Sequence, residues 1–119
     1  CAECPVYKTD LITASMVKYC INSFLATKVT FMNEMYDVLK NAKGADWNTF
    51  SKIIQTDPRI GKTHMKVPGA DGQRGYAGSC FPKDTSALAW HAREILNTPF
   101  TQLETSIKIN DTLRNKNNS

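Results

Sequence analysis

The sequence has no long apolar run, no strong β-strand pattern and no cluster of charges of one sign. No stretch approaches the ~20 apolar residues needed to cross a bilayer, and no signal peptide is recognisable. Lys and Arg number 15 against 11 Asp and Glu, a net charge of +4. These charges are scattered, and no basic stripe carries interleaved aromatic residues. We therefore expect no membrane or nucleic-acid partner, although an anionic small ligand would suit the mild positive charge.

Cysteine is also scarce, with four residues at Cys1, Cys4, Cys20 and Cys80. Cys1-x-x-Cys4 has no second pair to complete a four-ligand zinc site, so we interpret it as chance and expect no metal. Cys20 falls on an apolar helix and is predicted to be a small buried hydrophobe. This usage suits a reducing cytoplasm better than a disulfide scaffold, which predicts a cytoplasmic protein.

What is present is helical. The 119 residues suit a single domain. From Asp10 to Asn41 apolar residues recur at helical spacing, which predicts one helix of ~30 residues, about 45 Å long. Its apolar surface is wider than one stripe, and such a helix usually packs against another chain or another domain.

Three shorter helices are predicted after it. Asp46 is a candidate N-cap for residues 47–55, Asp84 for a helix to about Asn97, and an amphipathic segment runs from about Thr101 to Arg114. Residues 59–79 show no periodicity but hold five of the six glycines, and a loop of this length is usually functional or disordered. The predicted fold class is all-α, with a long central helix, three shorter helices and a Gly-rich active-site loop.

The loop ends in the segment that carries most chemistry, Gly75-Tyr-Ala-Gly-Ser-Cys80-Phe-Pro-Lys-Asp84. Small residues let the backbone approach a ligand closely, and Cys80 could meet that ligand as a nucleophile. A helix N-terminus and a cation, Lys83 or Lys18, would favour its thiolate. The alternatives are a plain buried cysteine and an aspartate that only caps a helix.

Lys18 and Asn22 lie four residues apart and share one face of the long helix. They could form a pair of donors that stabilises an oxyanion, or Lys18 could simply extend to solvent. His64 lies in the irregular loop, where it could line a pocket, whereas His91 is predicted to be structural. Neither histidine has a partner spaced for metal binding.

Taken together, three motifs resemble the UDP-glucose/GDP-mannose dehydrogenases, most closely the UDP-glucose 6-dehydrogenase type. The matching residues are Lys18-x-x-x-Asn22, Asp57-x-Arg59-Ile-Gly61 and Val67-Pro-Gly-x-Asp-Gly-x-Arg-Gly75-Tyr-x-Gly78-x-Cys80-Phe-Pro-Lys-Asp84. Their order, spacing and flanks agree from about Tyr7 to Asn115. The family usually has glycine where Ala77 stands.

The resemblance implies that residues 1–119 form the central helical domain, which dimerises through the long helix. In the family a Rossmann domain precedes this region and a UDP-binding domain follows it. This sequence has no G-x-G-x-x-G after a strand, so NAD would be held outside it and the chain alone should not turn over. UDP-glucose, UDP-N-acetylmannosamine and GDP-mannose stay open as substrates. The alternative is a stand-alone dimeric sugar-nucleotide-binding or assembly module.

The resemblance also implies roles for individual residues. The family oxidises a sugar C6 alcohol to a carboxylate in two hydride transfers to NAD. Cys80 would attack the intermediate aldehyde, and the thiohemiacetal would become a thioester that water cleaves. Lys18 and Asn22 would hold the C6 oxygen, while Asp84 would pair with Lys18 and position water. Arg59 would reach the substrate of the partner subunit, and the sugar-nucleotide site would be lined by Lys66, Gly75, Tyr76, Ala77, Gly78 and Phe81.

Overall fold

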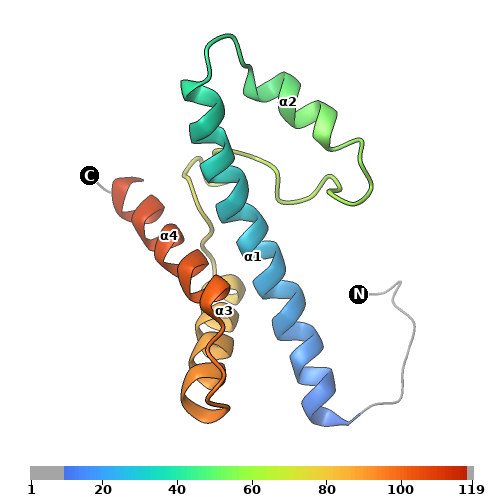
Figure 1. Cartoon of the computed structure of the whole chain (residues 1–119), viewed down its shortest axis with the longest axis vertical. Helices are drawn as coiled ribbons and strands as arrows, with labels where there is room; N and C mark the ends of the chain where they lie inside the picture. The colour runs from blue at the N-terminus through green and yellow to red at the C-terminus, as the bar shows by residue number, and fades with distance from the viewer. Residues whose placement is uncertain (1–9, 118–119) are drawn as a thin grey trace.

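The computed structural model describes residues 10–117, and over this range it is all-α and contains no strand, as predicted. Cys1 and Cys4 lie outside the described residues. The elements in chain order are α1 (Leu11–Asn41), α2 (Trp47–Ile54), α3 (Cys80–Trp90), the π-helical turn η1 (His91–Ile95) and α4 (Thr101–Asn117) (Figure 1).

Helix α1 has the predicted bounds because its end signals are local. The Asp10 carboxylate accepts a hydrogen bond from the Thr13 N–H at 2.7 Å, and Gly44, just beyond the helix, adopts a φ of +87°. Thirty-one residues make a helix of about 46 Å, in a molecule 50 Å long. α1 therefore spans the whole domain, with α3 and α4 along one side and α2 near its C-terminal end (Figure 1).

The face of α1 that α3 and α4 cover is built from small and polar side chains. Ser23, Ala26, Thr30 and Asn33 are its buried members at three- and four-residue spacing. Thr30 and Ser106 of α4 share a buried hydrogen bond of 2.9 Å between their hydroxyl groups. Small side chains let the helices approach closely, so the larger apolar residues of α1 lie on its other faces.

A second packing centre lies beneath α2. Met32, Met65 and Val67 are buried there, with Tyr36, Trp47 and Ile54 packed around them. Asp46 caps α2, as predicted, by accepting the Thr49 N–H at 2.8 Å. This packing holds one stretch of the long loop, around residues 65–67, against α1.

The predicted start of the third helix was wrong. α3 begins at Cys80 with Ser79 at the N-cap position, so Asp84 is the fifth residue of the helix and caps nothing. Pro82 permits this because a proline in the first turn has no intrahelical N–H bond to lose. Towards its end the helix widens into η1, where the Leu96 N–H donates to the His91 carbonyl at 3.0 Å.

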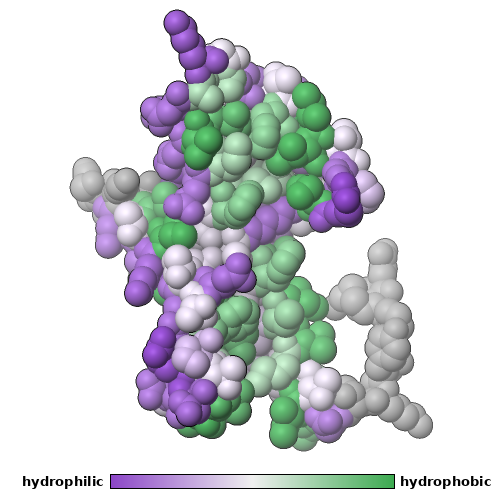
Figure 2. Space-filling model, in the orientation of Figure 1, coloured by the Kyte–Doolittle hydropathy of each residue, from purple (hydrophilic) through white to green (hydrophobic). Residues whose placement is uncertain are grey.

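The prediction that Cys20 is buried was also wrong, since its side chain is exposed. Every residue of α1 before Ser23 is exposed or half-buried, and Cys20 lies within this stretch. Figure 2 shows apolar surface open beside the first turns of α1 and again beside α2. No described helix is both long and apolar enough to cross a membrane.

Candidate active site

Three of the predicted catalytic residues meet between α1 and α3. The Asn22 amide Nδ2 donates to Asp84 Oδ2 at 2.6 Å, joining residues 62 positions apart. Lys18 Nζ lies 3.9 Å from the same oxygen, at the outer limit of an ion pair. The Asp84 side chain is only 1% exposed, whereas that of Lys18 is 62% exposed. A buried carboxylate is therefore held between an amide and an ammonium group that reaches it from solvent.

Cys80 stands one turn before this carboxylate. It is the first residue of α3, so its side chain and that of Asp84, four residues on, lie on the same face of the helix. The thiol is exposed, with Ser79 Oγ 3.8 Å from its sulfur. The free N–H groups of the first turn place the positive end of the helix dipole beside the thiol.

The Gly-rich loop and Phe81 of α3 enclose a cleft of about 590 Å³, a size that suits a small ligand. All six residues that the sequence predicted for the sugar-nucleotide site line this cleft, namely Lys66, Gly75, Tyr76, Ala77, Gly78 and Phe81. Lys62 and His64 line it too, and the ammonium groups of Lys62 and Lys66 would suit an anionic ligand.

The alanine in the loop fits its position without backbone strain. Gly75 and Gly78 adopt left-handed φ angles of +84° and +92°, but Ala77 is not among the residues with positive φ. A side chain at position 77 therefore escapes the roughly 1 kcal/mol that a left-handed conformation costs an L-residue.

Sequence reasoning missed the anchors of this loop. Arg74 donates to the Asn33 carbonyl oxygen at 2.6 Å and to both Asp37 carboxylate oxygens at 2.9 and 3.0 Å, and its guanidinium stacks over the Tyr36 ring at 5.2 Å. These contacts tie the loop to α1. A lone arginine in a polar loop gives no sign of such a partner set.

Asn110 of α4 was missed as well. Its Oδ1 accepts the Tyr76 N–H at 2.6 Å and its Nδ2 donates to the Tyr76 carbonyl at 3.0 Å. Burial raises the pKa of the Tyr76 phenol. The signal available in the sequence was a polar residue on the inward face of α4, seven residues after Leu103 and three before Leu113, both of which are buried.

His64 lines the cleft, and the sequence had suggested that it could line a pocket. Its ring lies 5.5 Å from that of Phe81, and its backbone is left-handed at φ 60°. Desolvation and then the positive charge of Lys28 lower the pKa of His64. The neutral ring is therefore favoured in the folded chain.

Arg59 lies outside this cleft. Its guanidinium pairs with Asp57 at 2.7 Å, and it borders a separate groove together with Phe24, Phe31 and Ile60. The predicted residues therefore fall into two sets, the six that line the cleft and the catalytic residues between α1 and α3, and Arg59 belongs to neither. Among the described residues, no group of three or more His, Cys, Asp or Glu side chains could hold a metal ion.

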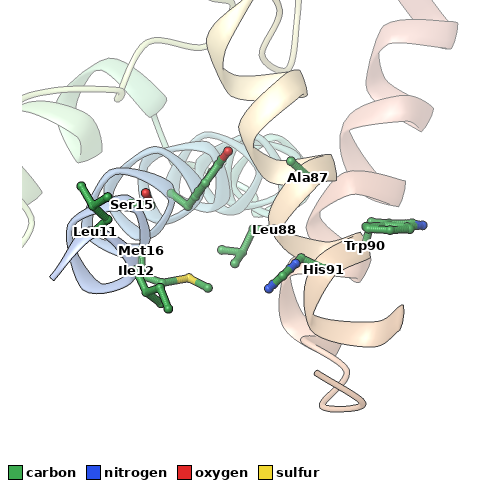
Figure 3. A pocket seen from close by; sticks show the side chains of 9 residues that line it. Leu11, Ile12, Ser15, Met16, Ala87, Leu88, Trp90 and His91 are labelled. Carbon is green, nitrogen blue, oxygen red and sulfur yellow. The ribbon is translucent and has the colours of Figure 1, made fainter. Parts of the chain in front are cut away.

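An apolar groove of about 470 Å³ lies apart from the cleft, between the first turns of α1 and the end of α3. Leu88 and His91 point across it towards Ile12 and Met16 (Figure 3). It contains none of the predicted site residues.

Known proteins resemble this chain over nearly its whole length. UDP-glucose 6-dehydrogenase YwqF of Bacillus subtilis (strain 168) is 39% identical over 109 residues, covering 92% of this chain and 23% of that protein. The putative UDP-glucose 6-dehydrogenase YtcA of the same strain is 43% identical over 110 residues, covering 92% and 24%. UDP-glucose 6-dehydrogenase of Rickettsia bellii (strain RML369-C) is 48% identical over 80 residues, covering 67% and 17%.

The chain therefore spans no more than about a quarter of the length of these curated relatives. The family model for the central domain matches residues 12–112, which includes the long helix, the Gly-rich loop and α3. The chain belongs to the UDP-glucose/GDP-mannose dehydrogenase family, and the region that it matches is the central domain.

Proposed function

We propose that this chain is the central domain of a UDP-glucose 6-dehydrogenase-type enzyme, which oxidises the C6 alcohol of a sugar nucleotide to a carboxylate. The observation that carries the proposal is the Lys18–Asn22–Asp84 cluster, with an Asn22–Asp84 bond of 2.6 Å. It stands one helical turn from an exposed cysteine. Family membership supplies the reaction class, and the cluster supplies groups suited to it.

Two donors and a thiol account for the carbonyl chemistry. The Lys18 ammonium and the Asn22 amide would hold the C6 oxygen and stabilise the negative charge that develops on it. The Cys80 thiolate would add to the C6 aldehyde carbon, forming a C–S bond while the carbonyl oxygen becomes the alkoxide of a thiohemiacetal. Loss of two electrons and a proton from that adduct would leave a thioester on the Cys80 sulfur.

The Asp84 carboxylate suits the final step. Its Oδ1 is buried and accepts no hydrogen bond from the described residues, so it has capacity to orient a water molecule. Attack of that water on the thioester would break the C–S bond, release the sugar carboxylate and return the thiol.

The family's electron acceptor is NAD, which takes up hydride. The described residues contain no strand and so no βαβ unit to hold a dinucleotide. These residues therefore do not fit NAD by themselves, and its site would lie in another part of the polypeptide. The cleft between residues 62 and 81 would hold the sugar nucleotide, with Lys62 and Lys66 near its phosphates.

The exposed surface of α1 supports a homodimer. Val17, Phe24, Phe31 and Val38 recur every seven residues and are 53–70% exposed. Residues seven apart lie on nearly the same face of a helix, and an apolar residue at this spacing supplies one of the two core positions of a coiled coil. Arg59 borders the same seam beside Phe24 and Phe31, so pairing of two α1 helices would bring it close to the other subunit and its substrate.

The test is NADH formation by the native polypeptide that contains this chain, assayed with UDP-glucose, UDP-N-acetylmannosamine and GDP-mannose. We expect activity with one of them, and its loss in Cys80→Ala. Cys20→Ala is the matched control, because Cys20 is exposed on α1, and it should keep full activity. Binding of a sugar nucleotide without turnover would favour the alternative, a binding or assembly module.

A further inference from the structure

We propose that Asn110 is a positioning residue for the candidate active site, holding the loop that leads to Cys80. Its carboxamide pairs with both backbone polar groups of Tyr76, at 2.6 Å for the N–H and 3.0 Å for the carbonyl. A neighbouring β-strand would offer the loop the same pair of bonds. Asn110 and Tyr76 are each 6% exposed, so little water competes for these bonds. This inference rests on the proposed function.

The loop backbone is shaped for this contact. A Cβ atom at Gly75 would lie 2.5 Å from Asn110 Oδ1, too close for any side chain, and φ at Gly75 is +84°. Glycine therefore meets both a steric and a conformational requirement here. One turn further along α4, Arg114 donates to the Arg74 carbonyl at 3.1 Å. The same face of α4 thus holds the loop backbone at Arg74 and at Tyr76, two residues apart.

Tyr76, which Asn110 holds, contacts α3 through its ring and its hydroxyl. Its ring packs edge-on against Phe81, with centroids 6.0 Å apart, and its hydroxyl lies 3.5 Å from Thr85 Oγ1. Phe81 directly follows Cys80, and Thr85 directly follows Asp84. Asn110 would therefore act on the thiol and the carboxylate through Tyr76, without touching substrate, so it would set their placement and not their chemistry.

The test compares Asn110→Ala with Ser106→Ala, which removes another buried polar contact of α4, the 2.9 Å bond to Thr30. Amide exchange at Tyr76 is followed by NMR. Iodoacetamide labelling of Cys80 is measured relative to Cys20 on tryptic peptides 75–83 and 19–28. Asn110→Ala should speed Tyr76 amide exchange at least tenfold and shift the Cys80-to-Cys20 labelling ratio at least threefold. Ser106→Ala should change the exchange rate and the labelling ratio only as much as its loss of global stability accounts for. Equal behaviour of the two variants would overturn the proposal.

Asn110→Asp keeps the test open should the alanine variant fail to fold. Aspartate retains an acceptor for the Tyr76 N–H but loses the donor to its carbonyl. Slow Tyr76 exchange with a shifted labelling ratio is expected, and fast exchange or an unchanged ratio would contradict the assigned contacts.

Activity of the native polypeptide separates this inference from the proposed function. With NAD and the sugar nucleotide that the wild-type polypeptide oxidises, Asn110→Ala should lower kcat at least tenfold and Ser106→Ala less than twofold. An active enzyme in which Asn110→Ala keeps the wild-type kcat would refute the positioning role alone. A native polypeptide that oxidises no sugar nucleotide, yet shows the exchange and labelling changes, would refute the function and leave the loop contact standing.

Discussion

Asn22 and Lys18 contact the same carboxylate oxygen but differ in what they contribute. Asn22 is half-buried and bonds Asp84 at 2.6 Å, whereas Lys18 is largely exposed and stands 3.9 Å away. The amide therefore satisfies a buried charge, while the ammonium remains free to meet a ligand. We therefore expect Asn22 to contribute mainly to stability and Lys18 mainly to catalysis.

Asn22→Ala should lower the free energy of unfolding by about 1–3 kcal/mol, because it leaves the buried Asp84 carboxylate without its nearest donor. Lys18→Ala should cost less than about 1 kcal/mol, since its ion pair is long and solvent-screened. Urea denaturation followed by circular dichroism measures both. Equal losses would mean that the carboxylate does not depend on the amide.

His64 should make stability depend on pH. Desolvation and the charge of Lys28 lower its folded-state pKa below the ordinary value of 6.5. Between these two pKa values the unfolded chain therefore binds more protons than the folded chain. The contribution of the neutral His64 ring to the free energy of unfolding is complete above pH 6.5 and is lost as the pH falls through the folded-state pKa. Thermal melts at pH 7.5 and 5.5 should show a smaller drop in Tm for His64→Gln than for the wild type. His91→Gln is the control, and a His64→Gln drop as large as that of the wild type would refute the prediction.

At the scale of elements, the loop between α2 and α3 is held by side chains of the helices around it. Arg74 reaches Asn33 and Asp37 on α1, Arg114 reaches Asp71 at 3.0 Å, and Asn110 reaches Tyr76. These polar contacts hold the part of the loop after Val67, which lies beyond the apolar packing of Met65 and Val67. The cleft should therefore depend on them for its shape.

Arg74→Met should destabilise the chain by about 1–3 kcal/mol, since it removes charge-assisted hydrogen bonds from a half-buried site. Arg74→Lys should recover little, because an ammonium cannot span Asn33 and Asp37 as the guanidinium does. Arg93, which forms a two-bond pair with Glu104 on the surface, is the matched control and should matter much less. Protease cleavage within residues 62–79 should accelerate in Arg74→Met, and an unchanged rate would argue against this anchor.

At the scale of the whole molecule, one helix about as long as the domain leaves apolar surface that α2, α3 and α4 do not cover. The exposed seam of Val17, Phe24, Phe31 and Val38 is what a second copy would bury. The stability of the free chain should therefore depend on its concentration.

Replacing both Phe24 and Phe31 with Glu should convert the proposed dimer into a monomer without loss of helix, because both side chains are exposed within the chain. Sedimentation velocity and circular dichroism measure the two properties. Ile53→Glu is the matched control, since Ile53 is 63% exposed and Phe31 62%, but Ile53 lies on α2. A wild-type chain that sediments as a monomer at tens of micromolar would refute the dimer.

Local signals explain what could be predicted. Asp10 and Asp46 mark the starts of α1 and α2 because an N-cap bonds to N–H groups within its own first turn. Cys80 and Asp84 share a helical face through their spacing alone. The predictions were wrong where two residues were both suitable as an N-cap, or where burial depended on which part of a helix its neighbours cover. Asp84 is a good capping residue, yet Ser79 took that place, and Cys20 sits on an apolar helix that its neighbours cover only from Ser23 onward.

The sequence by itself determined the all-α class, the extent of α1 and α2, the position of the Gly-rich loop and the family motifs, because periodicity, capping and glycine placement act over a few residues. Only the tertiary structure decided which face of α1 is buried, that Asp84 lies beside Asn22, and that Asn110 holds Tyr76. These contacts join residues 62 and 34 positions apart. Their geometry depends on how helices pack against one another, which no local pattern of residues specifies.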